Sequence, residues 1–481
     1  MFQRYRFHHA LRPTPHAPLR RWLALLLLPA LLGQGCTNAP SSEAAKLSTQ
    51  TTLTVWSAVD DQSNYNSIIT AFHAQYPYVT IVFKKFRLEE YESQLLNAMA
   101  EDRGPDVFMI HNDWVGKYQP KILPQPPQVK VAQEVVSGRN KVMEVQTATT
   151  ESPTQMKKDF VDVVAQDAIR KINVSTDAKK TDMQERVFGI PMSVDTLALY
   201  YNKDLLNASG IATPPETWGD FQKQVEKLTV IDAGGNITRS GAAFGTGANV
   251  ERSPDIIALL MMQNRQTMAD QNGYPAFTKI PPDVGTDVQN PPAYDAIRFY
   301  TDFADPQKSV YTWNASQPNS LDAFTRGNAA FFFGYSYHLP IIRSQAPKLN
   351  LGITHVPQIE NTPVVNFANY WMWTVSKKTK SPDLAWHFVN QITNQENEKA
   401  YLDLTKHPAA RRALIDAQLD SADVGVFASQ VLTATSWYRG VDPQTMEQAF
   451  MTMADSVVSG TAVNDAAKFA SQTISQTITS Q

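Results

Sequence analysis

The stretch that decides the fold runs from residue 189 to residue 206 and reads GIPMSVDTLALYYNKDLL. Its middle, Thr196 to Tyr201, is apolar and aromatic and predicts a β-strand. Residues 202–209 follow it with the pattern of a short helix. Further on, Thr217 and Asp220 have the spacing of a capping box at the start of another helix. Strands that lead directly into helices are typical of an α/β fold.

The segment before this stretch repeats the same alternation of strands and helices. Apolar runs predict strands at residues 53–56, 79–83 and 107–110. Between them, apolar residues recur at helical spacing over residues 65–76 and 91–99. The order strand, helix, strand, helix, strand predicts a parallel sheet with helices packed on its faces.

Residues 119–185 interrupt this alternation. The segment begins with several prolines, is polar over residues 134–156, and is longer than a connection between two such elements requires. We interpret it as an insertion and assign it no function.

A second α/β region follows the deciding stretch, and the chain then returns to a strand and a helix. Strands are predicted at residues 329–333, 349–354 and 370–375. One helix is predicted near residues 294–303, and another begins at Pro382, because proline suits the first position of a helix.

The first 35 residues have the pattern of a secretory signal peptide. They carry five arginines and no acidic residue, then an apolar run over residues 22–32 and a few small residues. The apolar run is shorter than the ~20 residues that a helix needs to cross a bilayer. We therefore expect residues 1–35 to be removed on export.

Cys36, the only cysteine, follows directly after this segment. Residues 32–36 resemble a bacterial lipobox, with Gly33 where that motif usually has leucine. The resemblance implies that Cys36 becomes the lipidated first residue; a plain signal peptide with an incidental cysteine is the alternative. Residues 36–51 are rich in Ser, Thr and Ala and are predicted to form a flexible tether.

Charge and length narrow the class of protein. Without residues 1–35 the formal net charge changes from −3 to −8, and the rest of the chain has no cluster of lysine and arginine. A nucleic-acid-binding protein would carry such a basic patch. The remaining chain is too long for one ordinary core, which predicts two lobes. We expect an extracytoplasmic protein, soluble apart from its lipid anchor, on the cell surface or in the periplasm.

Several segments together resemble the family 1 bacterial extracellular solute-binding proteins, which include the maltose-binding proteins of ABC importers. They are residues 53–77, 104–107, 189–206, 214–218 and 367–382. The resemblance covers nearly the whole mature chain. It implies a two-lobed α/β fold of the periplasmic-binding-protein type II, in which each lobe is a mostly parallel sheet flanked by helices and hinge strands join the lobes.

The same resemblance implies domain boundaries, a function and partners. We expect a first lobe of residues 52–193 with 366–412 and a second lobe of residues 194–365 with 413–481. A small solute, most simply a mono- or oligosaccharide, would be captured between them by hinge closure and delivered to the membrane permease of an ABC importer. We expect a monomer that needs no cofactor and no metal.

Candidate ligand-binding residues are aromatic and polar side chains at predicted strand ends and in loops. A sugar presents hydroxyl groups and C–H faces, which carboxylates, amides and aromatic rings can bind. The candidates are Trp56, Asp60, Asp61, Asn112, Asp113, Trp114, Asp195, Tyr335, Tyr337, Tyr370, Trp371, Trp437, Tyr438 and Arg439. The resemblance places cleft carboxylates at Asp113 and Asp195. Alternation along a strand puts Trp371 and Tyr370 on opposite faces, so at least one of these neighbours is expected to pack in the core.

The sequence gives little indication that the protein is an enzyme. The nine histidines are scattered, and the sequence contains no metalloprotease, nucleophile-elbow or P-loop motif. A secreted glycoside hydrolase also uses carboxylates and aromatics and remains an alternative, although eight βα repeats are not seen. Another alternative keeps the fold and binds a polyamine, a peptide or a phosphate ester. Arg439 is the main basic residue among the candidates, which disfavours an anionic ligand.

Overall fold

Two hydrophobic cores organise the chain in the computed structural model. The structure describes residues 41–177, 179–285 and 288–478. One core gathers buried side chains from residues 53–194 and 368–434, and the other gathers them from residues 197–367 and 427–474. We call the parts built around these cores the first lobe and the second lobe. The predicted signal peptide and Cys36 lie outside the described residues.

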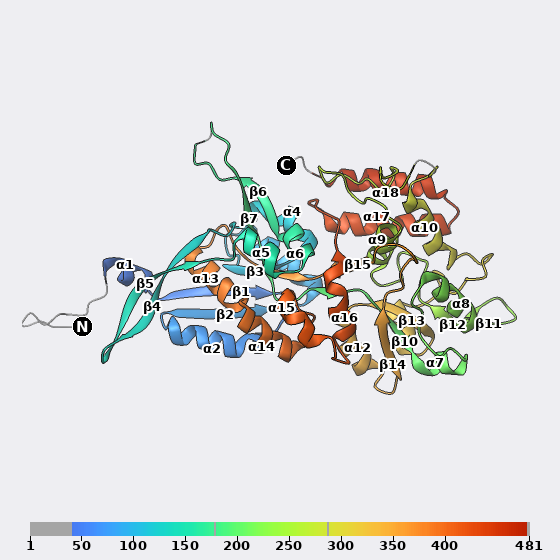
Figure 1. The fold of residues 1–481 in the computed structure, drawn as a ribbon, viewed down its shortest axis with the longest axis horizontal. Helices are drawn as coiled ribbons and strands as arrows, with labels where there is room; N and C mark the ends of the chain where they lie inside the picture. Colours follow the sequence, from blue (N-terminus) through green and yellow to red (C-terminus); the bar gives the residue numbers. More distant parts are fainter. Residues whose placement is uncertain (1–40, 178, 286–287, 479–481) are drawn as a thin grey trace, which may run out of the picture. The chain divides into compact units, whose positions relative to one another are not determined.

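The first lobe is built on a five-stranded sheet of order β2-β1-β3-β16-β8 (Figure 1). Its strands are β1 (Thr51–Ser57), β2 (Val79–Lys85), β3 (Val107–His111), β16 (Trp371–Val375) and β8 (Ile190–Pro191). The strand β1 pairs in parallel with β2 and β3, as predicted, but β16 runs antiparallel to both β3 and β8. Since β16 is antiparallel to both of its neighbours, the other four strands run in one direction, and the sheet of the first lobe is mostly parallel, as predicted.

Helices accompany the first-lobe sheet, and α2, α3 and α13 are the ones that the sequence predicts. The helices are α2 (Asn66–Gln75), α3 (Leu88–Ala100), α4 (Val115–Tyr118), α13 (Pro382–Ile392), α14 (Gln395–Thr405) and α15 (Arg412–Ile415). Short 3-10 turns join them, namely η1 (Gln62–Tyr65), η2 (Asn112–Trp114), η3 (Gln119–Lys121) and η4 (Asp416–Gln418). Pro382 does occupy the first turn of α13, as the sequence predicts.

The second lobe is built on a sheet of order β11-β12-β13-β10-β14. Its strands are β10 (Ala198–Asn202), β11 (Val230–Ile231), β12 (Ile237–Ala242), β13 (Ala329–Gly334) and β14 (Leu351–His355). Only the β12–β13 pair of this sheet is parallel. The expectation of a mostly parallel sheet is therefore wrong here, because β10 pairs antiparallel with both of its neighbours.

Helices surround this second sheet. They are α7 (Lys203–Ala208), α8 (Trp218–Leu228), α9 (Ser253–Gln263), α10 (Pro292–Asp302), α11 (Ser320–Thr325), α12 (His338–Gln345), α16 (Gly425–Gln430), the 3-10 turn η5 (Val431–Thr433), α17 (Pro443–Val458) and α18 (Val463–Ser475). The predicted capping box is confirmed, because the Asp220 amide donates to the Thr217 hydroxyl at 3.1 Å. Unlike the other helices, α9 is buried almost throughout. No helix in the described ranges is long and apolar enough to cross a membrane.

The chain passes between the lobes through a separate sheet of order β17-β15-β9. Its strands are β9 (Asp195–Thr196), β15 (Asn366–Asn369) and β17 (Ala434–Thr435). The strand β15 pairs antiparallel with β9 and parallel with β17. Each strand lies where the buried residues on its two sides belong to different cores.

The predicted insertion, residues 119–185, contains regular structure. It forms the hairpin β4 (Gln128–Ser137) and β5 (Asn140–Thr149), the helices α5 (Pro153–Asp159) and α6 (Asp162–Ala168), and β6 (Ile169–Asn173), which pairs with β7 (Met183–Val187). The predicted tether also contains structure: α1 (Ser42–Leu47) packs against the β4–β5 hairpin, where Ala44 is buried. A flexible tether is therefore not what the structure has at residues 42–47.

Candidate functional site

Aromatic residues gather at the carboxyl end of β3 in the first lobe. The rings of Trp114 and Trp371 meet edge to face with their centroids 5.2 Å apart, and both contact the His111 ring. Both tryptophans are only half-buried, so part of each ring remains accessible. Trp56, at the end of β1, packs instead on Phe86, with a centroid distance of 4.5 Å. Trp114 and Trp371 are thus the predicted aromatics that offer a surface together.

Charged groups of the two lobes approach each other beside these aromatics. In the first lobe, the His111 Nδ1 lies 2.5 Å from the Asp113 carboxylate. Burial lowers the pKa of His111, but the Asp113 carboxylate outweighs burial and the net shift is upward, opposed by the Arg252 charge. Burial raises the pKa of Glu447, which Arg252 lowers and Asp113 raises. The charges of the two lobes therefore act on one another here, Arg252 on His111 and Asp113 on Glu447, and we group these residues as one candidate site.

Arg252 organises the second-lobe side of this site. Its guanidinium donates to both Asp255 oxygens at 2.8 Å and lies 2.9 Å from Glu447. The Tyr335 hydroxyl donates to Asp255 at 2.6 Å, and the Tyr337 ring stacks on Tyr335 at 5.7 Å. Arg252 immediately precedes α9 with φ of 55°, a left-handed conformation that is uncommon for a residue with a side chain. Backbone strain of this kind is concentrated at functional sites.

Sequence reasoning missed Arg252, Asp255 and Glu447. A local signal was present for two of them, because arginine and aspartate three residues apart flank Pro254, which marks a helix start. Glu447 could not have been found in this way, since it comes from α17 and meets Arg252 only in the folded chain. We call Asp113, Trp114, Trp371, Arg252 and Glu447 the interlobe site.

Three predicted residues converge on Asp167, a buried carboxylate that the sequence analysis did not select. The Asn112 amide donates to it at 3.1 Å and the Tyr370 hydroxyl at 2.8 Å. Arg439 forms an ion pair with it at 2.5 Å, and the Ser436 hydroxyl donates at 2.7 Å. Burial and the Asp167 charge raise the pKa of Tyr370 well above its usual value, so its hydroxyl remains a donor. The structure therefore brings these predicted residues together, and their polar groups bind the Asp167 carboxylate.

Asp195 lies in the crossing strand β9 and is bound by the second lobe. Its carboxylate accepts from the Ser336 amide at 2.9 Å and from the Ser336 hydroxyl at 2.6 Å. Burial raises its pKa, and the hydrogen bonds from Ser336 oppose that shift. The Ser336 hydroxyl also lies 3.4 Å from the Nδ1 of His407, a first-lobe residue. Asp195 is therefore placed at a junction of the lobes.

Asp60 and Asp61 have partners within the first lobe. Asp60 is buried and accepts from the Tyr65 hydroxyl at 2.7 Å and the Tyr401 hydroxyl at 3.1 Å. Asp61 is exposed and pairs with Lys85 at 2.8 Å. Both arrangements are those of structural acids.

Trp437 and Tyr438 pack into the core of the second lobe. Trp437 is 7% exposed and contacts the rings of Phe450 and Phe277. The Tyr438 hydroxyl lies 2.7 Å from the Thr477 hydroxyl. The structure brings neither ring into contact with Trp114 or Trp371, so their predicted stacking role remains a prediction.

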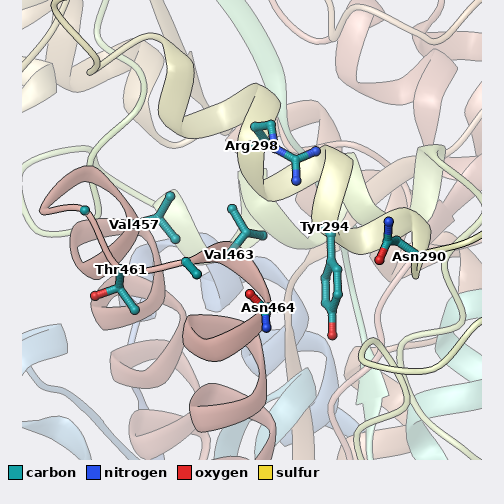
Figure 2. A pocket seen from close by; sticks show the side chains of 9 residues that line it. Asn290, Tyr294, Arg298, Val457, Thr461, Val463 and Asn464 are labelled. Carbon is teal, nitrogen blue, oxygen red and sulfur yellow. The ribbon is translucent and has the colours of Figure 1, made fainter.

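One pocket of the second lobe lies away from the interlobe site. It has a volume of about 480 Å³ and is lined from α10 by Tyr294 and Arg298 and, around the α17–α18 turn, by Val457 of α17, Thr461 of the turn and Asn464 of α18 (Figure 2). A second, about 350 Å³, lies between Arg326 and Lys348 on the second lobe. Both are open surface hollows, and we base the function on the interlobe site, where partly buried charges and accessible aromatics combine.

The chemistry available at the interlobe site is binding. Accessible tryptophan faces can stack on a ligand, and carboxylates with a guanidinium can exchange hydrogen bonds with its hydroxyl groups. Within the described ranges, no group of three or more His, Cys, Asp or Glu residues is arranged to hold a metal ion.

Two lobes joined by three crossing strands, with aromatic and charged groups where the lobes meet, define a solute-binding protein. The chain belongs to the bacterial extracellular solute-binding protein family, whose model matches residues 56–399. That family comprises extracytoplasmic binding proteins rather than enzymes. The family resemblance stated from the sequence is thereby confirmed.

Three distant relatives cover about nine-tenths of the chain. A galactooligosaccharide-binding protein of Bacillus subtilis is 22% identical over 90% of this chain and 89% of its own length. The cyclic alpha-maltosyl-1,6-maltose binding protein of Arthrobacter globiformis has a similar structure, with TM-score 0.66, 16% identity, and coverage of 89% of this chain and 98% of its own. The GacH receptor of Streptomyces glaucescens, solved unliganded and with acarbose, gives TM-score 0.63, 17% identity, and coverage of 89% and 98%. These structures confirm the two-lobed α/β fold.

Proposed function

We propose that this protein is the substrate-binding component of an ABC importer and captures a small carbohydrate, most simply an oligosaccharide, between its lobes. The observation that carries the proposal is the interlobe site. Accessible faces of Trp114 and Trp371 lie beside Asp113 in the first lobe, and Arg252 and Glu447 approach from the second lobe. Stacking faces next to hydrogen-bonding charges are what a sugar ring requires.

The ligands of the relatives support the choice of an oligosaccharide. The Bacillus subtilis relative is named for galactooligosaccharides, the Arthrobacter globiformis protein for a cyclic maltosyl-maltose, and the Streptomyces glaucescens receptor was solved with acarbose. All three names describe glycosidically linked rings, although the proteins differ widely in sequence from this chain. Within our proposal, the site accepts more than one sugar ring.

Capture follows from hinge motion within the proposed lobes, residues 52–193 with 366–412 and residues 194–365 with 413–481. The two cores and the crossing sheet β17-β15-β9 support the boundaries near residues 193 and 366. The last boundary falls nearer β17 than residue 412, because Leu414, Ile415 and Ala434 are buried in the first core. Because the ligand contacts both lobes, it stabilises the closed arrangement by its differential affinity for it. The permease would then recognise the closed protein.

The cellular setting is also part of the proposal. We place the protein as a monomer, anchored to the membrane through a lipid on Cys36 and delivering its ligand to the membrane subunits of an ABC permease. The lipobox-like residues 32–36 and the known family support this setting.

A thermal-shift panel tests the class of ligand. Since a ligand that binds only the folded state raises its stability, the melting temperature should rise with oligosaccharides in a concentration-dependent way. Polyamines, peptides and phosphate esters serve as the comparison set. A rise with one of those and none with any sugar would keep the solute-binding role and discard the carbohydrate. Hydrolysis of a glycosidic bond, detected in the same samples by chromatography, would overturn the proposal in favour of a glycoside hydrolase.

A further inference from the structure

The buried carboxylate of Asp167 joins segments that belong to different lobes. Asp167, Asn112 and Tyr370 are parts of the first lobe, in which neighbouring side chains fill its core. Ser436 and Arg439 follow β17, where the chain enters the second lobe. Asp167 therefore has two partners within its own lobe and two in the segment that leads out of it.

The insertion supplies this carboxylate. Asp167 lies in α6, whose Val163, Val164 and Ala168 are buried in the first core. The same helix contacts the crossing strand β17 and the first-lobe strand β8. Residues 119–185, which the sequence left without a function, thus hold a charged group against the crossing.

A second arginine makes the cluster dependent on that one carboxylate. Arg170 is buried, and its Nε lacks a hydrogen-bond partner among the described residues. Burial, and next the neighbouring Arg439 charge, lower the pKa of Arg170 to about 10. Asp167 is the acid whose charge acts on Arg170, and it also pairs directly with Arg439. Without it, the charges of Arg170 and the partly buried Arg439 would act on each other with no acid of this cluster to offset them.

We propose that Asp167 is a latch across the hinge: it holds the segment of Ser436 and Arg439 against α6 and thereby sets the balance between the conformation described here and one in which the lobes have turned apart at β17. Rotation of the second lobe about β17 would change the Asp167–Arg439 distance, because Asp167 belongs to α6 of the first lobe and Arg439 follows β17 into the second lobe. The latch is built into the insertion and does not require the ligand.

Removal of the Asp167 charge gives a directional prediction. In Asp167→Asn, Arg170 and Arg439 lose their counter-charge and repel each other, and breaking a buried pair from one side is strongly unfavourable. We expect the population of the conformation with separated lobes to rise at least ~10-fold. Adding Arg439→Gln to Asp167→Asn removes the repulsion. In this double variant, the population with separated lobes should therefore fall part of the way back to the wild-type value.

The measurement is the distance between the lobes in the ligand-free full chain. Thr154 of α5 and Gln448 of α17 are exposed and suit cysteine substitution and spin labelling in a Cys36→Ser background. Double electron–electron resonance should show a shift to longer Thr154–Gln448 distances in Asp167→Asn. Asp162→Asn is the matched control, because Asp162 lies on the same helix and its ion pair with Arg412 is solvent-exposed; this variant should leave the distances unchanged.

Each outcome of this measurement either supports or overturns the latch. Unchanged distances in Asp167→Asn, or an equal shift in Asp162→Asn, would overturn the latch. If circular dichroism shows that Asp167→Asn does not fold, Ser436→Ala is measured instead; it keeps all charges and removes one bond of the latch, and unchanged distances there overturn the inference. Since no ligand is present, a failure of the latch is distinguishable from a failure of the carbohydrate proposal.

Discussion

His387 shows how one buried side chain couples stability to pH. It is 4% exposed on α13, and its Nε2 lies 2.6 Å from the Tyr76 hydroxyl. Burial lowers its pKa to about 4, whereas an unfolded chain titrates histidine near ~6.5. As pH falls below ~6.5, the unfolded state binds a proton that the folded state does not, so stability is lost progressively between ~6.5 and 4. The loss from this residue approaches ~3 kcal/mol at the acid end.

Substitution of His387 by glutamine tests this coupling. Glutamine keeps a hydrogen-bonding group near Tyr76 and does not titrate, so the free energy of unfolding should fall less between pH 7.5 and pH 4.5 than in the wild type. Urea unfolding at the two pH values measures the difference. The exposed His73→Gln should retain the wild-type pH dependence. An equal pH dependence in His387→Gln and the wild type would contradict the assignment.

At the scale of the element, the start of α8 rests on a single side chain. Thr217 caps the helix by accepting from the Asp220 amide, and its hydroxyl donates to the Asp220 carboxylate at 3.0 Å. Loss of such a cap costs ~1 kcal/mol. Thr217→Ala should therefore lower the urea midpoint without changing the slope of the transition. Lys223→Ala, on an exposed position of the same helix, should change stability by less than ~0.5 kcal/mol.

Elements with a clear pattern could be predicted from the sequence, and those without one could not. The helix α8 has a polar face and a buried face, whereas residues 256–262 of α9 form a continuous apolar run that shows no period because the helix is buried on nearly all sides. The β4–β5 hairpin was missed although valines occur on both sides of Gly138, whose positive φ of 64° suits the turn. A hairpin signal was therefore present in residues 128–149, but the polar composition of this segment led us to interpret it as an insertion without assigned structure.

Some residues of the interlobe site could also be predicted from the sequence, and others could not. Asp113, Trp114 and Trp371 could be predicted because they follow or occupy strands whose ends meet at one edge of the sheet. Glu447 could not, because its partner Arg252 is far away in sequence. The sequence also could not distinguish an aspartate that faces a ligand from Asp60, whose tyrosine partners become visible only after folding.

At the scale of the whole molecule, function depends on two lobes that share one ligand. Trp371 belongs to the first lobe and Arg252 to the second, and three crossing strands join these lobes. A ligand that needs both sides should lose affinity when either side is changed. A ligand bound to one lobe alone would respond to one substitution only.

Capture of one ligand by both lobes is tested most directly by a calorimetric titration. Oligosaccharides are titrated into the wild type, Trp371→Ala, Arg252→Gln and Phe469→Ala. Phe469 is the control, since it is 61% exposed on α18 and is not part of the interlobe site. We predict micromolar or tighter binding of an oligosaccharide to the wild type, at least ~10-fold weaker in Trp371→Ala and in Arg252→Gln, and unchanged in Phe469→Ala. Wild-type affinity in both interlobe variants would contradict capture between the lobes at this site.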